Sequence, residues 1–243
     1  MKARTVATAV ATLLLSLTGV GNAVALPAAR HGVPQVNGAQ LRSALLPPSG
    51  FGDGFVMNST LDTGRRLLHQ RTVDFPHRMS CADFETSVIV SGWGNTAGAD
   101  SEVDNQNWTS QYPTTVAFVD QEVFQFGNDD AAVSFLKQAQ AKYRSCTSFT
   151  TPNPGDTIPG GGTLTFNLDS IGWTSVSGAR AFYAIQNYAP TEFPGAYTLY
   201  VDVLWAVSGP DVYRFWEISG INDVPSPTMT QLLHRVQGLY RGR

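Results

Sequence analysis

The chain lacks the short sequence motifs that mark the common classes of enzyme. It contains no nucleophile elbow, no H-E-x-x-H zinc motif, no dinucleotide fingerprint and no zinc-type cysteine spacing. The glycine triplet at 160–162 precedes an expected strand, so it lacks the strand-to-helix context of a phosphate-binding loop. We therefore expect no enzymatic activity, no catalytic residues, no cofactor and no metal site.

Charge is also scarce, and neither sign dominates. Asp, Glu, Lys and Arg make up 14% of the 243 residues, and the formal net charge is −3. Binding to nucleic acid or to an anionic membrane surface requires a basic patch. No basic stripe occurs along the sequence, so we expect no nucleic-acid partner.

No apolar run is long enough to span a membrane, but a shorter run lies near the N-terminus. Lys2 and Arg4 precede the apolar stretch 6–17, which is shorter than the roughly 20 residues of a spanning helix. Small residues at 23–25 follow, as is typical of a signal peptidase site. We predict a signal peptide over 1–25, secretion, and no membrane span in the mature chain; the alternative is an uncleaved anchor.

Cysteine is limited to two residues, Cys81 and Cys146. In an exported chain two cysteines most economically form one intramolecular disulfide. Closing so long a loop stabilises a fold by about 4 kcal/mol in the chain-entropy model. An intermolecular bridge and two free thiols remain alternatives, whereas the absence of C-x-x-C argues against a redox-active pair.

Three helices are indicated by capping residues and helical periodicity. Asn37 and Gln40 form a capping box, and the prolines at 47–48 end the helix that follows. Asn128 or Asp129 caps a second helix that ends near Cys146. The third begins near 226. The inner face of the second helix consists of Ala132, Phe135, Leu136, Ala139 and Tyr143. That of the third consists of Met229, Leu232, Leu233, Val236, Leu239 and Tyr240.

Alternating apolar residues indicate strands, most clearly in the second half of the chain. Apolar residues occupy every second position from 197 to 207, and a turn at 208–211 leads into a return strand. A β-rich run at 116–126 changes phase near 120–122, which suggests a bulge. We expect loops at 49–77 and 94–108. After a flexible segment over 26–37, residues 38–243 form one α+β domain: an antiparallel sheet of about five to six strands, helices on one face and one disulfide.

Aromatic residues are the main candidates for a binding site. Trp93, Trp108 and Trp173 lie in loop-like stretches, where an indole suits stacking against a sugar or peptide. The alternative is that these rings anchor their own loops. Weaker candidates of the same cleft lie on or beside the expected sheet: Tyr188, Glu192 and Tyr200.

Two polar groups suggest other chemistry. His69 and His77 share a loop with Asp74 and form a possible acid–base or metal cluster; the alternative is a pair of solvated histidines. Asp100, Glu102 and Asp104 alternate and offer oxygen ligands for calcium, although the EF-hand pattern is not met. The alternative is a solvated acidic loop.

Several of these stretches, taken in order, resemble the PknH-like extracellular sensor domain family of actinobacteria. The resemblance rests on the helix ending in Pro47-Pro48, on Cys81, on the strand at 121–126, and on Tyr143-Arg144-Ser145-Cys146. It covers roughly residues 38 to 240. Members are the outer parts of receptor Ser/Thr kinases or stand-alone exported proteins. The family commonly has two disulfides, whereas this chain has cysteines for only the first.

The resemblance implies a cleft beside the sheet for a small or cell-wall-derived ligand. We therefore expect a secreted, non-enzymatic ligand-binding or sensor-type domain, with a possible protein partner in the envelope. Two alternatives stay open. One is a secreted protein–protein interaction module or inhibitor, and the other is a secreted hydrolase with a dispersed site that includes His69 and His77.

Overall fold

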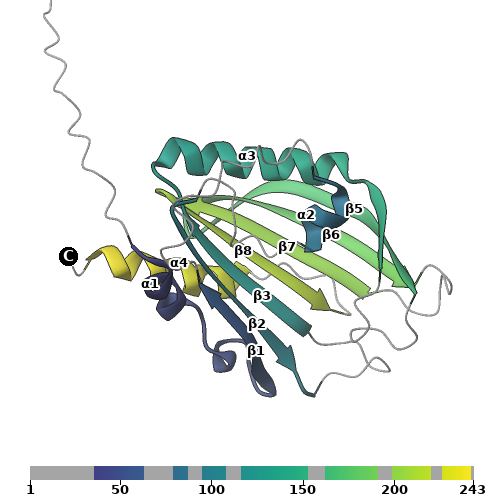
Figure 1. Ribbon diagram of the computed structural model, residues 1–243, viewed down its shortest axis with the longest axis horizontal. Coiled ribbons are helices and arrows are strands. Elements are labelled where there is room, and N and C mark those ends of the chain that lie inside the picture. The colour runs from purple at the N-terminus through teal and green to yellow at the C-terminus, as the bar shows by residue number, and fades with distance from the viewer. Residues whose placement is uncertain are drawn as a thin grey trace, which may run out of the picture. The chain divides into compact units, whose positions relative to one another are not determined.

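The computed structural model consists of one antiparallel sheet with helices on both faces (Figure 1). Its described residues are 36–62, 79–86, 95–107, 116–152, 162–190, 199–219 and 226–241. Within them the sheet has eight strands, and every neighbouring pair is antiparallel.

The order of the strands across the sheet is β1-β2-β3-β8-β7-β6-β5-β4. The last two strands of the chain therefore lie at its centre, where both faces are buried. The bounds of the strands are β1 Phe55–Asp62, β2 Ala97–Asn105, β3 Val116–Gln125, β4 Ser148–Pro152, β5 Thr163–Val176, β6 Ala179–Pro190, β7 Leu199–Ser208 and β8 Asp211–Ser219.

The described helices are α1 Gly38–Ala44, the 3₁₀ turn η1 Pro48–Gly50, α2 Cys81–Thr86, α3 Asp129–Ser145 and α4 Ser226–Arg241. Asn37 and Gln40 cap α1 reciprocally, as the sequence predicts. The Asn128 side chain accepts a hydrogen bond from the Ala131 amide and so caps α3. No helix in the described ranges is long and apolar enough to cross a membrane.

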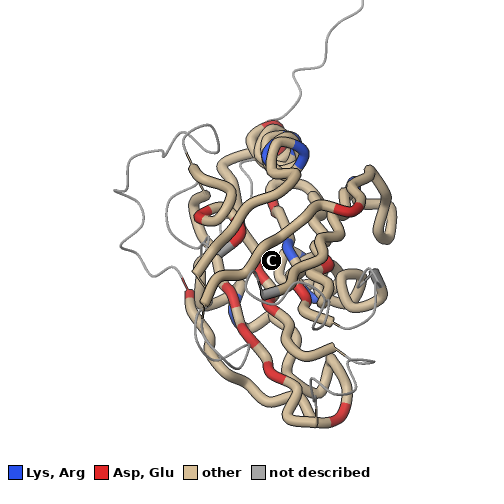
Figure 2. The backbone as a smooth tube through the Cα atoms, turned by 90° about the vertical axis from the view of Figure 1, so that its right-hand side faces the viewer, with Lys and Arg blue, Asp and Glu red and all other residues tan. Residues whose placement is uncertain are grey.

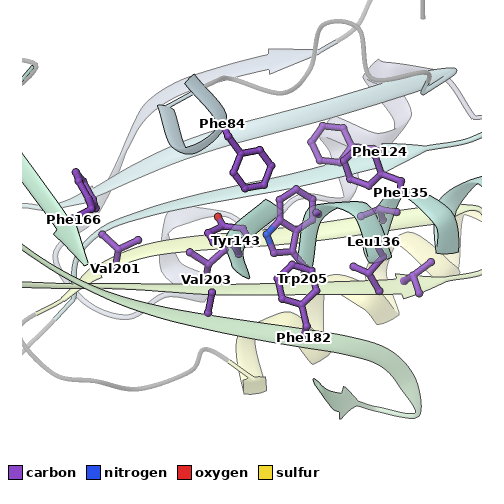
Figure 3. Packing of buried hydrophobic residues seen from close by; sticks show 14 of the residues in the cluster. Phe84, Phe124, Phe135, Leu136, Tyr143, Phe166, Phe182, Val201, Val203 and Trp205 are labelled. Carbon is purple, nitrogen blue, oxygen red and sulfur yellow. The ribbon is translucent and has the colours of Figure 1, made fainter. Parts of the chain in front are cut away.

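One core lies between the sheet and the helices α2 and α3. Alternate residues of β7 point into it, including Val203, Trp205 and Val207. Trp205 is fully buried at its centre. Figure 3 shows this indole among aromatic rings from both helices and from β6: Phe84, Phe135, Tyr143 and Phe182.

The other core lies between the opposite face of the sheet and the helices α1 and α4. Leu204 and Ala206 of β7 point into it, as do Tyr213 and Phe215 of β8. The predicted inner face of α4 packs here. The expectation of helices on one face is therefore wrong, because the central strands are apolar on both sides and each side needs cover.

The expected count of five to six strands is also wrong, because the sequence predicts loops where β1 and β2 lie and predicts no strand at β4. Both strands are rich in polar residues, and β2 reads Ala-Gly-Ala-Asp-Ser-Glu-Val-Asp-Asn. Its apolar residues Ala97, Ala99 and Val103 nevertheless alternate and enter the core under α1. The alternation of small with acidic residues is therefore that of a strand, and the α+β class with a disulfide holds.

The structure also tests the predicted bulge in β3 and the predicted disulfide at α2. The register of β3 against β8 shifts between Val116 and Phe118, not near 120–122. The predicted disulfide between Cys81 and Cys146 is confirmed, with Cα atoms 5.6 Å apart. Because Cys146 is the C-cap of α3, the bond fixes the first residue of α2 to the end of the longer helix.

Candidate functional site

A row of side chains crosses the sheet on the face covered by α2 and α3. Each member is the antiparallel partner of the next, so the strand pleat places them on one face. The row is acidic at one end and aromatic at the other, with a single arginine at the junction. It runs Asp100, Glu122, Arg214, Trp205, Phe182, Trp173.

A second row lies beside it on the same face. Glu102 pairs with Asp120, which pairs with Trp216. The Ser59 hydroxyl donates a hydrogen bond of 2.9 Å to Glu102. In Figure 2 several acidic positions, in red, follow one another along the backbone, and basic positions, in blue, are few.

Arg214 is the centre of the polar part of this face and is only 2% exposed. Its Nη1 donates to Glu122 at 2.9 Å and lies 3.8 Å from Asp120. Its Nη2 donates to the Glu85 carbonyl oxygen at 3.3 Å. The guanidinium carbon lies 5.6 Å from the centre of the Trp205 ring. The arginine thus joins β3, β8, β7 and α2.

Helix α2 contributes a further carboxylate from above the sheet. The Trp216 indole donates a 2.6 Å hydrogen bond to Glu85, which is almost fully buried. Phe84 beside it packs edge-on against Tyr143 of α3. Six residues are too few for an independent helix. The disulfide and Phe84 therefore hold Glu85 in place.

Carboxylates greatly outnumber cations around Arg214. We call the six acidic residues the carboxylate cluster. The elements β1, β2, β3, β8 and α2 together contain one basic residue, Arg214. Even when the arginine pairs with one carboxylate, the charge of the remaining acids is uncompensated if they ionise. The cluster consists of Glu85, Asp100, Glu102, Asp104, Asp120 and Glu122.

This crowding changes the acidity of the cluster. Burial, and then the charges of Glu122 and Glu102, raise the pKa of Asp100 to about 7. Burial and Glu122 also raise the pKa of Asp120 well above its ordinary value. Burial raises the pKa of Glu85 despite the opposing effect of Arg214.

The same causes act on the two remaining shifted groups. Burial and Glu102 raise the pKa of Asp104. Burial disfavours the charge of Arg214, but the carboxylates around it, Glu122 first, raise its pKa above the ordinary range. The folded protein therefore disfavours the ionised form of Glu85, Asp100, Asp104 and Asp120 and favours the charged form of Arg214.

Several polar atoms of this site have no hydrogen-bond partner among the residues that the structure describes. They are Nε of Arg214, Oδ1 of Asp100 and Oδ1 of Asp120. Arg214 and Asp100 are buried, whereas the Asp120 side chain is 15% exposed. An unpaired buried polar group costs about 1–3 kcal/mol, and more when it is charged. Such groups are the ones that a bound ligand can satisfy.

Metal binding is not supported by the arrangement of these acids. Within the described ranges, no three His, Cys, Asp or Glu side chains are grouped closely enough to hold an ion. The calcium hypothesis for Asp100, Glu102 and Asp104 assumed a loop. The strand places the three at successive positions along one face, so they do not wrap around a common point.

The aromatic candidates that the structure describes, Trp173, Tyr188 and Tyr200, do not converge on one place. Trp173 is 39% exposed, and its ring stacks with Arg180 at 4.2 Å. Tyr188 is buried and stacks on Phe166. It lies six positions further along β6 than Phe182, which is the strand partner of Trp173. That separation is about 20 Å along a strand. Tyr200 pairs with Asn187 and lies on the opposite face of β7 from Val201 and Val203.

Other predicted site residues lie outside the described residues. These are Trp93, Trp108, Glu192, His69 and His77, as well as the signal peptide 1–25. His234 is described: its Nε2 lies 3.2 Å from the Ser177 hydroxyl at an exposed position. The binding role of the aromatic candidates and the absence of enzymatic activity therefore stay predictions.

The sequence alone does not identify five residues of the site: Glu85, Asp120, Glu122, Arg214 and Trp216. The available signal was the alternation of acidic residues in two separate segments, Asp100-x-Glu102-x-Asp104 and Asp120-x-Glu122. Recognising both segments as strands would have placed the acids on one face of each. The pairing of the two strands with each other and with β8 is a long-range fact that no local pattern carries.

Comparisons with known proteins reveal a likeness in structure. No family model and no curated protein sequence matches the chain. The crystal structure of the extracellular domain of PknH from Mycobacterium tuberculosis is similar, with a TM-score of 0.55 and 12% sequence identity. The match covers 86% of this chain and 98% of that chain. The two proteins share a fold.

Proposed function

We propose that this chain is an extracytoplasmic, non-enzymatic ligand-binding domain of the sensor type, and that its ligand binds at the carboxylate cluster around Arg214. The ligand is a small or cell-wall-derived molecule. The observation that carries the proposal is a set of three polar atoms, on Asp100, Asp120 and Arg214, that have no partner in the described chain and lie within a cluster of six carboxylates and one arginine.

An extracytoplasmic location is supported by two independent features. The disulfide between Cys81 and Cys146 is of the kind that persists in oxidising compartments. The fold is shared with a domain described as extracellular. The signal sequence predicted over residues 1–25 agrees with both.

The polar site has the composition of a binding site. Converging polar groups with raised pKa values lie beside half-buried aromatic rings, Phe118 and Trp216, which meet edge-on at 5.7 Å. Small-molecule sites combine such an apolar wall with a few oriented polar groups.

A thermal-shift screen of cell-wall fragments and small metabolites tests this function. A ligand at 100-fold its dissociation constant should raise the free energy of unfolding by about 2.7 kcal/mol. Phe118→Ala should reduce that ligand-dependent increase, because Phe118 borders the site. Phe149→Ala is the matched control, since Phe149 is also half-buried but lies on β4 at the far edge of the sheet. Equal losses in both variants, or no stabilising compound in the screen, would contradict the proposal.

A second candidate is a protein–protein interaction module. It is favoured by β1, which lies at one edge of the sheet and exposes Val56, Met57 and Leu61. Edge strands can add a strand from a partner chain. A pull-down from envelope extracts with wild type and Met57→Lys tests it: the candidate requires a partner that the variant loses.

A further inference from the structure

We infer that the ligand of the carboxylate cluster is an organic cation. It is a compact molecule that carries a primary ammonium group, an apolar side and a hydrogen-bond acceptor. This inference rests on the proposed function and names the ligand class of the same site.

The charge balance of the cluster favours a cation. The cluster has six carboxylates, on β2, β3 and α2, and one guanidinium, and the acids that act on Arg214 are Glu122, Asp120 and Glu85. The best placed of them, Glu122, is already bonded to Arg214. An anionic ligand would add to the repulsion, whereas an ammonium would relieve it.

The position of the unpartnered oxygens matches an ammonium group. Asp100 and Asp120 are diagonal neighbours on β2 and β3, because their direct partners are Glu122 and Glu102 respectively. Diagonal Cβ atoms across an antiparallel pair are about 7 Å apart. Each of the two acids has an Oδ1 atom with no partner in the described chain. The three donors of an ammonium can serve two such oxygens from a point between them.

The acidic residues of the second row are more exposed than those of the first row. Asp100 and Glu122 are 1% and 0% exposed, whereas the side chain of Asp120 is 15% exposed and Glu102 is half-buried. A ligand therefore approaches from the second row and places its charged end against the first. Asp120 is therefore the carboxylate to test: it is placed to contact the ligand, and replacing it should disturb the core less than replacing Asp100 or Glu122.

The surroundings favour an organic cation over a metal ion. The described side chains do not group three ligands for a metal. Trp216 is the strand partner of Asp120, and Phe118 packs against it, so an apolar wall adjoins the acids. Aromatic faces stabilise ammonium groups and contact their carbon skeleton. The Nε–H of Arg214, which has no partner in the described chain, can donate a hydrogen bond to an oxygen of the ligand. Amino sugars and aminoacyl groups carry such an oxygen beside their ammonium group.

The experiment compares amines with their N-acetylated forms on the folded, disulfide-bonded chain. The probe pairs are D-glucosamine with N-acetyl-D-glucosamine, and D-alaninamide with N-acetyl-D-alaninamide, titrated by calorimetry near neutral pH and at physiological ionic strength. Acetylation removes the positive charge and leaves the rest of the molecule in place. Calcium and magnesium are titrated in parallel. The variants are Asp120→Asn and the control Asp53→Asn, which makes the same charge change at an exposed turn.

We expect at least one amine to bind, its acetylated form to bind at least about tenfold more weakly, and Asp120→Asn to weaken the amine about tenfold. Asp53→Asn should leave the affinity unchanged. Equal binding of both forms, or binding of the metals alone, would overturn the ligand class and leave the proposed function standing. Equal losses in the two variants would show non-specific attraction and overturn the site. Silence of these probes with a hit from the wider screen would overturn only the ligand class.

Discussion

At the scale of single residues, the ionisation of each polar group in the site depends on the charges of its neighbours. Asp100, Glu122 and Arg214 each look ordinary in the sequence, but the sheet pairs them across three strands. Their energetics then depend on one another more than on solvent. Removing one charge should therefore have effects whose sign depends on which charge is removed.

Removal of the acid Asp100 should stabilise the protein. Its pKa is raised to about 7 by burial and by neighbouring acids, so its ionised form is disfavoured in the folded state. Asp100→Asn keeps the shape and removes the charge. We expect the free energy of unfolding near pH 7.5 to rise by about 1 kcal/mol or more in urea denaturation. Asp53→Asn should leave it unchanged, and a clear loss in Asp100→Asn would contradict the electrostatic account.

Removal of the cation Arg214 should have the opposite effect. Arg214→Met leaves buried carboxylates without compensation, which typically costs about 3–5 kcal/mol. Adding Glu122→Gln should recover part of that loss, because the uncompensated charge is then gone. Urea denaturation of both single variants and the double variant measures the coupling. Additive losses would show that the 2.9 Å contact between the two side chains is not the origin of the effect.

At the scale of elements, the short helix α2 connects the disulfide to the site. It begins at Cys81 and carries both Phe84, which enters the core, and Glu85, which holds Trp216. Its position depends on a covalent bond at one end and a buried ring near the other. The disulfide therefore stabilises the fold and also fixes one wall of the candidate site.

Replacing both cysteines should weaken the fold and loosen the site. For Cys81→Ser with Cys146→Ser we expect a loss of about 4 kcal/mol in the free energy of unfolding. At conditions where the variant is still folded, its tryptophan fluorescence should shift, because Trp216 loses a fixed Glu85 partner. Comparing the spectrum of the Trp216→Phe variant, with the disulfide intact, with that of the wild type identifies the fluorescence that comes from Trp216. A variant with unchanged fluorescence would show that α2 is held without the bond.

The elements also show which parts of the fold the sequence predicts. Helix caps at Asn37 and Asn128 and the regular apolar period of β7 are local signals, and the structure confirms each. Strands β1 and β2 were missed because their polar faces obscure a weak apolar alternation. The site was missed with them, since two of its carboxylate-bearing segments meet only through strand pairing.

At the scale of the whole described fold, the two central strands β7 and β8 are buried on both faces, and the polar site lies toward one edge of one face. Raised pKa values are spread over this fold. Besides Asp100, burial and the charge of Asp129 raise the pKa of Asp211 to about 7, against the opposing hydrogen bond from Tyr240. Both groups bind protons more tightly in the folded than in the unfolded state.

Stability should therefore increase on mild acidification. For a carboxyl whose folded pKa is raised, the stabilising contribution is complete below the unfolded pKa of about 4 and is lost as pH rises to about 7. We expect the free energy of unfolding to rise as pH falls from about 7 to about 5. Urea denaturation across this range measures it, and the double variant Asp100→Asn with Asp211→Asn should flatten the profile. A steady loss of stability over the same range would contradict the raised pKa values.

The central claim is that the carboxylate cluster around Arg214 is the place where a ligand binds. Chemical-shift mapping of backbone amides tests it most directly, with any compound that stabilises the protein in the screen. The account predicts that the perturbed amides concentrate in β2, β3, β8 and α2, around Asp120 and Glu85. Perturbations confined to β5 and β6 around Trp173 and Tyr188 would contradict it.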